Sequence, residues 1–333
     1  MATGIIIGIA GLINGLAFGI LSVLPKMTPD KVDGVDSKVR IAVGLASQMG
    51  GDSPYIAAFN EMTQFVGYYD PSGKIETGGF SDFNINQHCD KCRKGQQATY
   101  LQIFAGDDAI CVAYIGQTWA DGTKLGWLGD MGKVCGMPNY YSNIQVEMAD
   151  GGSHVPYCTW FDRDHSDPTF NVGAIQLHMP AFSKMGQYSA PPENVLCSKP
   201  ITVAHYDAGR DDSILPSFWG STRKSRRTLG SSKKDFRPRS SASNSAFNET
   251  LIASHLPQHN ATALCASPES RGPDFISFDE GVFCDMTNRI TWPLCGETIT
   301  NGCYDWKTHS FVDRKLRKRE TDYSNIVEWK SGG

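Results

Sequence analysis

The feature that most constrains the fold is a series of short apolar segments separated by turn residues, densest between residues 99 and 146. Residues 101–105 are mostly apolar, residues 110–115 are entirely so, and Gly106-Asp107-Asp108 between them has the composition of a turn. A short apolar run between turn signals predicts a strand that is buried on both faces. The Asp121-Gly122 pair that follows predicts a hairpin with a type I′ turn.

The same pattern extends over residues 38–185. Residues 39–45 alternate apolar and small or polar side chains, as do residues 172–179, and no long segment has the 3.6-residue period of a helix. The sequence therefore predicts a mainly β protein whose first domain is an antiparallel β-sandwich or jelly roll.

The second half of the chain changes composition. Residues 186–263 are rich in Ser, Arg, Lys and Pro, with eight basic residues and a single aspartate between 223 and 239, and we predict a disordered basic linker there. Residues 264–312 regain aromatic residues and cysteines, which predicts a small disulfide-rich segment, either docked on the first domain or independent of it. Residues 313–333 form a basic tail. The chain as a whole has a net charge of −4, so a nucleic-acid-binding function is not expected.

The ten cysteines predict an oxidising compartment, because they fall into two even blocks on either side of the linker. We expect disulfides within each block and none between them. The members of the two blocks are Cys89, Cys92, Cys111, Cys135, Cys158 and Cys197, then Cys265, Cys284, Cys295 and Cys303. Cys89 and Cys92 form a lone CxxC motif, for which a local disulfide or two bridges from one loop are favoured over a zinc or redox site.

The N-terminal residues 1–25 carry no charged side chain. They are interpreted as a signal peptide with a small-x-small cleavage site at Ala17-Phe18-Gly19. The alternative is an uncleaved hydrophobic anchor, since residues 4–24 are long enough to span a bilayer as a helix, and a membrane partner is expected only if they are retained.

Acidic residues in predicted turns supply the candidates for metal binding and catalysis. Asp162, Asp164 and Asp167 form a DxDxxD-like loop that a Ca²⁺ ion would suit, although a solvated turn is the favoured interpretation. Asp107 and Asp108, or the 162–167 cluster, would serve a hydrolase that needs two facing carboxylates. No GxSxG, HExxH, GxGxxG or P-loop motif accompanies them, and no catalytic residue is assigned.

Aromatic residues supply the candidates for ligand binding. We predict that Trp127 lies at the surface between glycines, and that Tyr140, Tyr141 and Asp130 lie near it in a carbohydrate-stacking platform; the alternative is that the aromatic rings fill the core. Asn248 and Asn260 are N-glycosylation sequons in the predicted linker.

The stretch AICVAYIGQTWADGTKLGWLGDMGKVCG, together with CTWFDRDH and GPDFISFDEGVFCDMTNRITWPLCG, resembles a family of secreted proteins from filamentous fungi. The resemblance covers most of residues 38–182 and 272–305 and implies secretion, but no activity or catalytic residue. The strand pattern is also loosely similar to lipid- or sugar-binding β-sandwiches of the PLAT and lectin kinds.

These observations predict a secreted, disulfide-stabilised interaction protein whose partner is a cell-wall or host-surface carbohydrate, with no resident cofactor. A secreted hydrolase of polysaccharides and a membrane-anchored surface protein are the alternatives.

Overall fold

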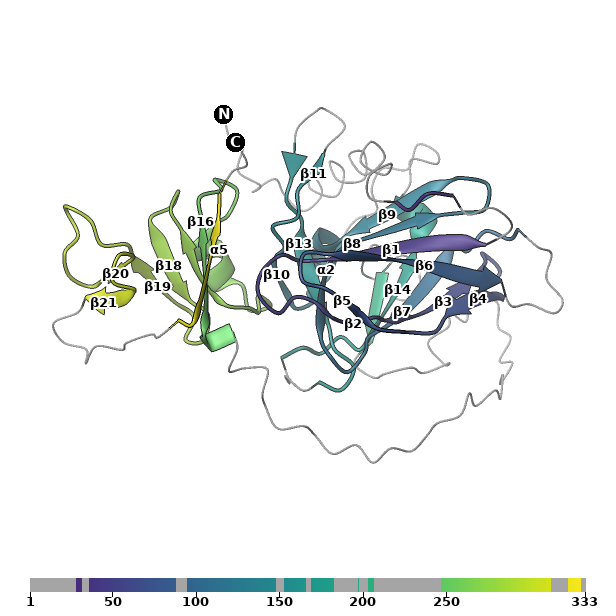
Figure 1. Ribbon diagram of the computed structural model, residues 1–333, viewed down its shortest axis with the longest axis horizontal. Helices are drawn as coiled ribbons and strands as arrows, with labels where there is room; N and C mark the ends of the chain where they lie inside the picture. The colour runs from purple at the N-terminus through teal and green to yellow at the C-terminus, as the bar shows by residue number, and fades with distance from the viewer. Residues whose placement is uncertain are drawn as a thin grey trace.

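The computed structural model describes residues 28–31, 36–87, 95–147, 153–165, 169–182, 197, 203–206, 247–312 and 323–330. These residues form two β-rich modules, which lie next to each other along the long axis of the molecule (Figure 1). We call the described residues between 36 and 206 the N-terminal module, and those between 247 and 330 the C-terminal module.

The N-terminal module is built on an antiparallel sheet of eleven strands. Its strands, in spatial order, are β10 (Asn139–Tyr141), β13 (Tyr157–Phe161), β8 (Ile110–Thr118), β1 (Ser37–Val43), β6 (Phe80–Gln87), β4 (Phe65–Tyr69), β3 (Tyr55–Phe59), β7 (Tyr100–Phe104), β14 (Ala174–His178) and β15 (Val203–Tyr206), with β9 (Lys124–Leu128) also paired to β8. Two short ribbons, β2 (Gly51–Asp52) with β5 (Lys74–Ile75) and β11 (Val146–Glu147) with β12 (Ser153–His154), accompany it.

The sheet curls around one hydrophobic core. The helix α2 (Gly129–Val134) follows β9, and the 3₁₀ helix η1 (Met179–Phe182) follows β14 and contacts β9, so the two ends of the sheet approach each other. Side chains of β1, β7, β8, β9 and β14 fill the space between them. The predicted mainly β, sandwich-like domain is therefore confirmed, with a single curled sheet supplying both layers.

The central prediction of a fully buried strand is confirmed, because every residue of β8 is buried. The Asp121-Gly122 hairpin also forms, between β8 and β9, but its turn is not of type I′. Only Gly122 has a positive φ, of 90°, and its N–H donates to the carbonyl of Trp119 at 2.9 Å. Residues 120–122 therefore make a three-residue loop, in which glycine occupies the left-handed position that this loop requires.

The C-terminal module contains a sheet of five strands in the order β19 (Ile290–Pro293), β18 (Val282–Asp285), β17 (Asp274–Ser277), β16 (Thr250–Ser254) and β22 (Asn325–Trp329). A separate hairpin joins β20 (Cys303–Asp305) and β21 (Ser310–Val312). Unlike the N-terminal sheet, this one is mixed. Strand β16 pairs in parallel with both β17 and β22, and the helix α5 (Ala261–Ala266) connects β16 to β17. A parallel pair needs such a crossover connection.

Two predicted boundaries were wrong. Strands β15 and β16 lie inside the range 186–263 that was assigned to the linker, and α5 begins inside it; β22 lies inside the range 313–333 that was assigned to the basic tail. The physical reason is burial: all five residues of β16 are buried between β17 and β22. Residues 207–246, the most basic part of the predicted linker, lie outside the described residues.

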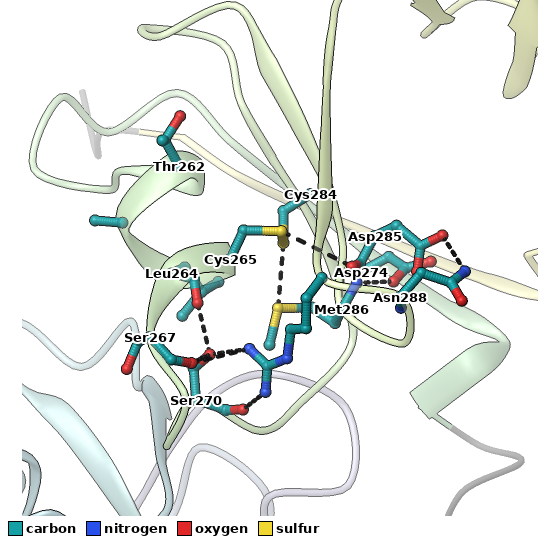
Figure 2. The surroundings of a disulfide bond; sticks show 12 residues. Thr262, Leu264, Cys265, Ser267, Ser270, Asp274, Cys284, Asp285, Met286 and Asn288 are labelled. Carbon is teal, nitrogen blue, oxygen red and sulfur yellow. Dashed lines mark hydrogen bonds between the residues drawn. A yellow bond between two sulfur atoms is a disulfide. The ribbon is translucent and has the colours of Figure 1, made fainter.

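The predicted separation of the disulfides is confirmed for eight cysteines. Each bridge stays within its own block, and the pairs are Cys111–Cys158, Cys135–Cys197, Cys265–Cys284 and Cys295–Cys303. The Cys265–Cys284 bridge fixes α5 to β18 (Figure 2). Cys89 and Cys92 lie outside the described residues.

The two modules are docked through a shared hydrophobic cluster, which contains Tyr140, Tyr141 and Trp160 from one module and Leu264, Phe275 and Trp329 from the other. Backbone hydrogen bonds reinforce it: the Asn139 N–H donates to the Glu269 carbonyl at 2.9 Å, and the Arg271 N–H donates to the Asn139 carbonyl at 2.8 Å. We call residues 267–273 the docking loop. An apolar interface that is reinforced by backbone hydrogen bonds holds the two modules together in a fixed arrangement.

The predicted signal peptide or anchor, residues 1–25, lies outside the described residues. In the part of the chain that the structure describes, no helix is long and apolar enough to cross a membrane.

Candidate ligand-binding surface

The predicted aromatic platform is not at the surface, and that prediction was wrong. Trp127, Tyr140 and Tyr141 are 0%, 0% and 3% exposed. Trp127 lies in β9 opposite Ile115 of β8, and this pairing directs both side chains into the N-terminal core. The glycine after this strand, Gly129, serves close packing: a Cβ there would lie 2.2 Å from the Tyr157 carbonyl oxygen.

Tyr140 and Tyr141 instead connect the modules. The Tyr140 hydroxyl donates to the Pro273 carbonyl at 2.8 Å. The Tyr141 hydroxyl accepts from the Asn260 N–H at 2.9 Å and donates to the Asn260 carbonyl at 3.2 Å. Burial raises the pKa of both phenols, so each stays protonated and able to donate. The polar ends of these rings therefore serve docking.

The fourth predicted residue of the platform, Asp130, is also buried, and it lies in a polar cluster on α2. Its carboxylate contacts His154 Nε2 at 3.1 Å. Burial opposes protonation of His154, but the charge and hydrogen bond of Asp130 outweigh it and raise the pKa of the imidazole. Burial lowers the pKa of Lys133 to about 8, although Asp130 opposes the shift, and the ammonium lies 3.4 Å from the Tyr157 ring centroid. The cluster supports the helix by charge pairing and cation–π contact.

Two of the acidic catalytic candidates form ion pairs with basic side chains. Asp107 accepts from Arg163 at 2.7 Å, and Asp108 accepts from Lys74 at 2.6 Å. The Arg163 N–H donates to the Gly106 carbonyl at 3.0 Å, so the loop after β7 lies beside the loop after β13. The structure therefore places the two loops that the hydrolase alternative named next to each other, joined through Arg163.

The same loop after β13 contains the predicted calcium ligands. Asp162 is buried, Asp164 is partly exposed, and Asp167 lies outside the described residues. Among the residues that the structure describes, no group of three or more His, Cys, Asp or Glu side chains is placed to hold a metal ion. The calcium site and the hydrolase both stay predictions.

Both sequon asparagines are exposed and lie in the C-terminal module. Asn260 is the N-cap of α5, where its side-chain oxygen accepts from the Ala263 N–H at 2.5 Å. Asn248 accepts from the Thr287 hydroxyl at 3.0 Å. In both residues it is the side-chain oxygen that is engaged, whereas a glycan attaches to the nitrogen. Glycosylation stays a prediction.

The structure reveals a different aromatic surface on β3 and β4, on the face of the sheet opposite the core. Its rings contact one another in a row, which we call the aromatic row: Phe59, Phe65, Tyr68 and Tyr55. The Phe65 and Tyr68 ring centroids are 6.2 Å apart with 26° between the ring planes, and those of Tyr68 and Tyr55 are 6.1 Å apart with 25°. Tyr68 is thus stacked on both of its neighbours in the row.

One end of the aromatic row is open to solvent. Phe65 is 37% exposed, Met62 in the adjoining β3–β4 turn is 67% exposed, and Tyr68 is partly exposed, whereas Phe59 and Tyr55 are buried. Exposed apolar groups that adjoin one another, rather than standing singly, are characteristic of interaction sites.

A β-bulge explains why Phe65 and Tyr68 share one face. Strict alternation along residues 65–69 would place Phe65 and Tyr69 together and Tyr68 opposite them. The register of β3 and β4 shifts at Ala58/Phe59, so that Phe59 pairs with Phe65 while Ala57 pairs with Tyr68. The extra residue on β4 moves Tyr68 to the outer face and Tyr69 toward the core, where its ring packs on Phe83. Sequence reasoning missed the surface because the bulge has no clear signature in this segment.

Polar side chains flank the exposed end of the row. Asn60 orders the β3–β4 turn, because its side-chain oxygen accepts from the N–H groups of Met62 at 3.0 Å and Gln64 at 2.9 Å. Glu61 contacts His178 at 3.1 Å, and the imidazole of His178 stacks on Tyr100 at 4.5 Å between centroids. The surface therefore combines ordered rings with a carboxylate, an imidazole and amides.

Comparisons with known proteins do not assign the chain to a family. No family model matches the chain, and no curated protein matches it. Among solved structures, a crystal structure of a LOX variant is similar to 37% of this chain at 10% identity, with a TM-score of 0.22. The match spans 16% of that LOX chain, and the TM-score is too low to support an argument about fold or function. The resemblance to secreted fungal proteins stays a prediction.

Proposed function

We propose that the protein is a secreted binding protein that holds a carbohydrate of a cell wall or host surface on the aromatic row. The observation that carries the proposal is the stacking of Tyr68 between Phe65 and Tyr55 in a row that is open to solvent at Phe65. Aromatic faces suit the apolar C–H faces of sugar rings, and flanking carboxylate and amide groups suit their hydroxyls.

The bridges support the extracellular part of the proposal. Four disulfides, divided between two small β modules, are what an oxidising compartment permits and the cytosol opposes. Secretion itself is tested by N-terminal sequencing of the mature protein. A start at Ile20 supports cleavage of a signal peptide, and a start near Met1 contradicts it in favour of the anchored alternative.

Sedimentation with insoluble chitin, cellulose, β-glucan and mannan tests carbohydrate binding. We expect the protein to sediment with at least one of them, and the double substitution Phe65→Ala and Tyr68→Ala to weaken that binding by about tenfold or more, which corresponds to about 1.4 kcal/mol. Ile290→Ala is the matched control, because it removes an exposed apolar side chain, 48% exposed, from the other module.

Two outcomes would contradict the proposal: no binding to any of the four polysaccharides, or equal binding by the wild type and the double variant. Release of reducing sugar from a bound polysaccharide would favour the hydrolase alternative instead.

A further inference from the structure

The β20–β21 hairpin displays a tryptophan on a well-ordered turn. Trp306 is the first of four turn residues between the strands, and it is partly exposed. The Asp305 carboxylate accepts from the Lys307 N–H at 2.9 Å, and His309 takes a left-handed conformation with φ of 48°. The Cys295–Cys303 disulfide ties the start of the hairpin to the chain before it. The turn thus orders the Trp306 ring, which packs with one side against the buried cluster that contains Phe283 and Tyr304 and stays partly exposed.

A second hairpin shows that this exposure is not a consequence of the turn itself. Between β18 and β19, Asp285 likewise accepts from an N–H within a four-residue turn, here that of Asn288 at 2.8 Å, and Arg289 has a φ of 59°. In this hairpin the residue after the aspartate, Met286, is 7% exposed and lies beside the Cys265–Cys284 bridge (Figure 2). A four-residue turn therefore buries a methionine in one hairpin and leaves a tryptophan partly exposed in the other.

Trp306 belongs to a second chain of aromatic contacts. Its centroid lies 5.2 Å from that of Phe278 and 5.0 Å from that of His309, and the imidazole of His255 stacks on Phe278 at 4.2 Å. All four side chains are partly or fully exposed. We call these four residues the second aromatic surface.

The second aromatic surface lies at a part of the sheet that is suited to ligand binding. His255 and Phe278 directly follow the parallel strands β16 and β17, so the surface lies at the carboxyl ends of a parallel pair, where ligands commonly bind. Glu328 lies 4.0 Å from His255 and pairs with Lys330 at 2.7 Å. Rings and charged groups therefore occur together here, as they do beside the aromatic row.

The two surfaces lie far apart on one body. In Figure 1, β3 and β4 lie at one end of the long axis, and the β20–β21 hairpin lies at the other. The shared cluster and the docking loop fix this arrangement. A single short oligosaccharide cannot reach both surfaces, whereas two separate polymers can each occupy one.

We propose that the second aromatic surface is a further carbohydrate-binding site centred on Trp306, and that the protein cross-links separate polysaccharide chains. This inference rests on the proposed function of the aromatic row. A protein with two sites at a fixed separation can bridge two polysaccharide chains through the contacts of each site alone, without any additional contact.

The test is a two-step capture assay with the full-length protein. The protein is bound to beads coated with whichever of chitin, cellulose, β-glucan or mannan it sediments with; the beads are washed, and fluorescent soluble fragments of the same polysaccharide are added. We expect the wild type to capture fragments. Trp306→Leu keeps apolar bulk against Phe278 but lacks a ring, so it should stay on the beads and lose capture by about tenfold or more. Trp306→Phe keeps a ring and should retain most of the capture.

The outcomes separate the two proposals. Capture by Trp306→Leu equal to that of the wild type overturns the second site, as does a wild type that binds the beads but captures nothing. In either case the proposed function stands. A wild type that binds no polysaccharide overturns both proposals.

Discussion

Replacing Tyr141 by phenylalanine should loosen the contact between the modules without unfolding either of them. The Tyr141 hydroxyl is buried and satisfies both backbone groups of Asn260 across the interface. Removing it takes the acceptor from the Asn260 N–H, at a cost of about 1–3 kcal/mol, whereas the Asn260 carbonyl still accepts from the Leu264 N–H. Taking about 2 kcal/mol, separation of the modules should become about 30-fold more frequent, since 1.4 kcal/mol is a factor of ten.

Hydrogen exchange at the interface measures this separation directly. The amides of Asn139 and Arg271 donate across the interface, so their protection should fall by about the same 30-fold factor in Tyr141→Phe. Amides within the N-terminal sheet, such as that of Ile103 in β7, should keep their protection because they do not depend on docking. The control is Tyr100→Phe, which makes the same chemical change at a buried tyrosine of β7 that lies outside the interface between the modules. Unchanged protection of Asn139 and Arg271 would refute the idea that this hydroxyl holds the modules together.

Three further predictions concern stability and modification. Because the folded-state pKa of His154 is raised above its ordinary value of 6.5, the His154–Asp130 pair stabilises the protein fully below about pH 6.5 and less as pH rises through the raised pKa. His154→Gln should therefore reduce the free energy of unfolding by about 2 kcal/mol at pH 5 and by less at pH 9, measured in urea titrations. An equal reduction at both pH values would contradict this prediction. Removing the Cys265–Cys284 bridge, which joins cysteines at a sequence separation of 19, should cost about 3 kcal/mol, measured by calorimetry; a melting temperature equal to that of the wild type would exclude a stabilising role. Mass spectrometry of the secreted protein should find a glycan on Asn260, and an unmodified peptide would refute that prediction.

The sequence was most informative where local and tertiary preferences agree. Strand β8 was predictable because six consecutive apolar residues, 110–115, fit a strand with neighbours on both sides, and the Asp121-Gly122 hairpin was predictable from its glycine. Its turn type was not, since the number of loop residues depends on how β8 and β9 pair.

The candidate site was not predictable, because tertiary pairing determines which aromatic rings reach solvent. Tyr140 and Tyr141 lie in a short strand with no local sign of an interface, and they pack against a segment more than a hundred residues away. Phe65 and Tyr68 share a face through a register shift that involves β3. The helix α5 was missed for a related reason: Asn260 was interpreted as a glycosylation site, although it also satisfies the N-cap preference of the helix that follows.

Oxidative footprinting of the bound complex tests the central claim most directly. Hydroxyl radicals label exposed Met, Phe and Tyr side chains strongly and exposed Ile side chains more weakly, and Met62 and Phe65 are 67% and 37% exposed in the free protein. With saturating soluble fragments of the bound polysaccharide, the account predicts that labelling of Met62, Phe65 and Tyr68 falls, while labelling of Ile290 does not change. Bound fragments that leave Met62, Phe65 and Tyr68 as reactive as in the free protein would show that the aromatic row is not where the carbohydrate binds.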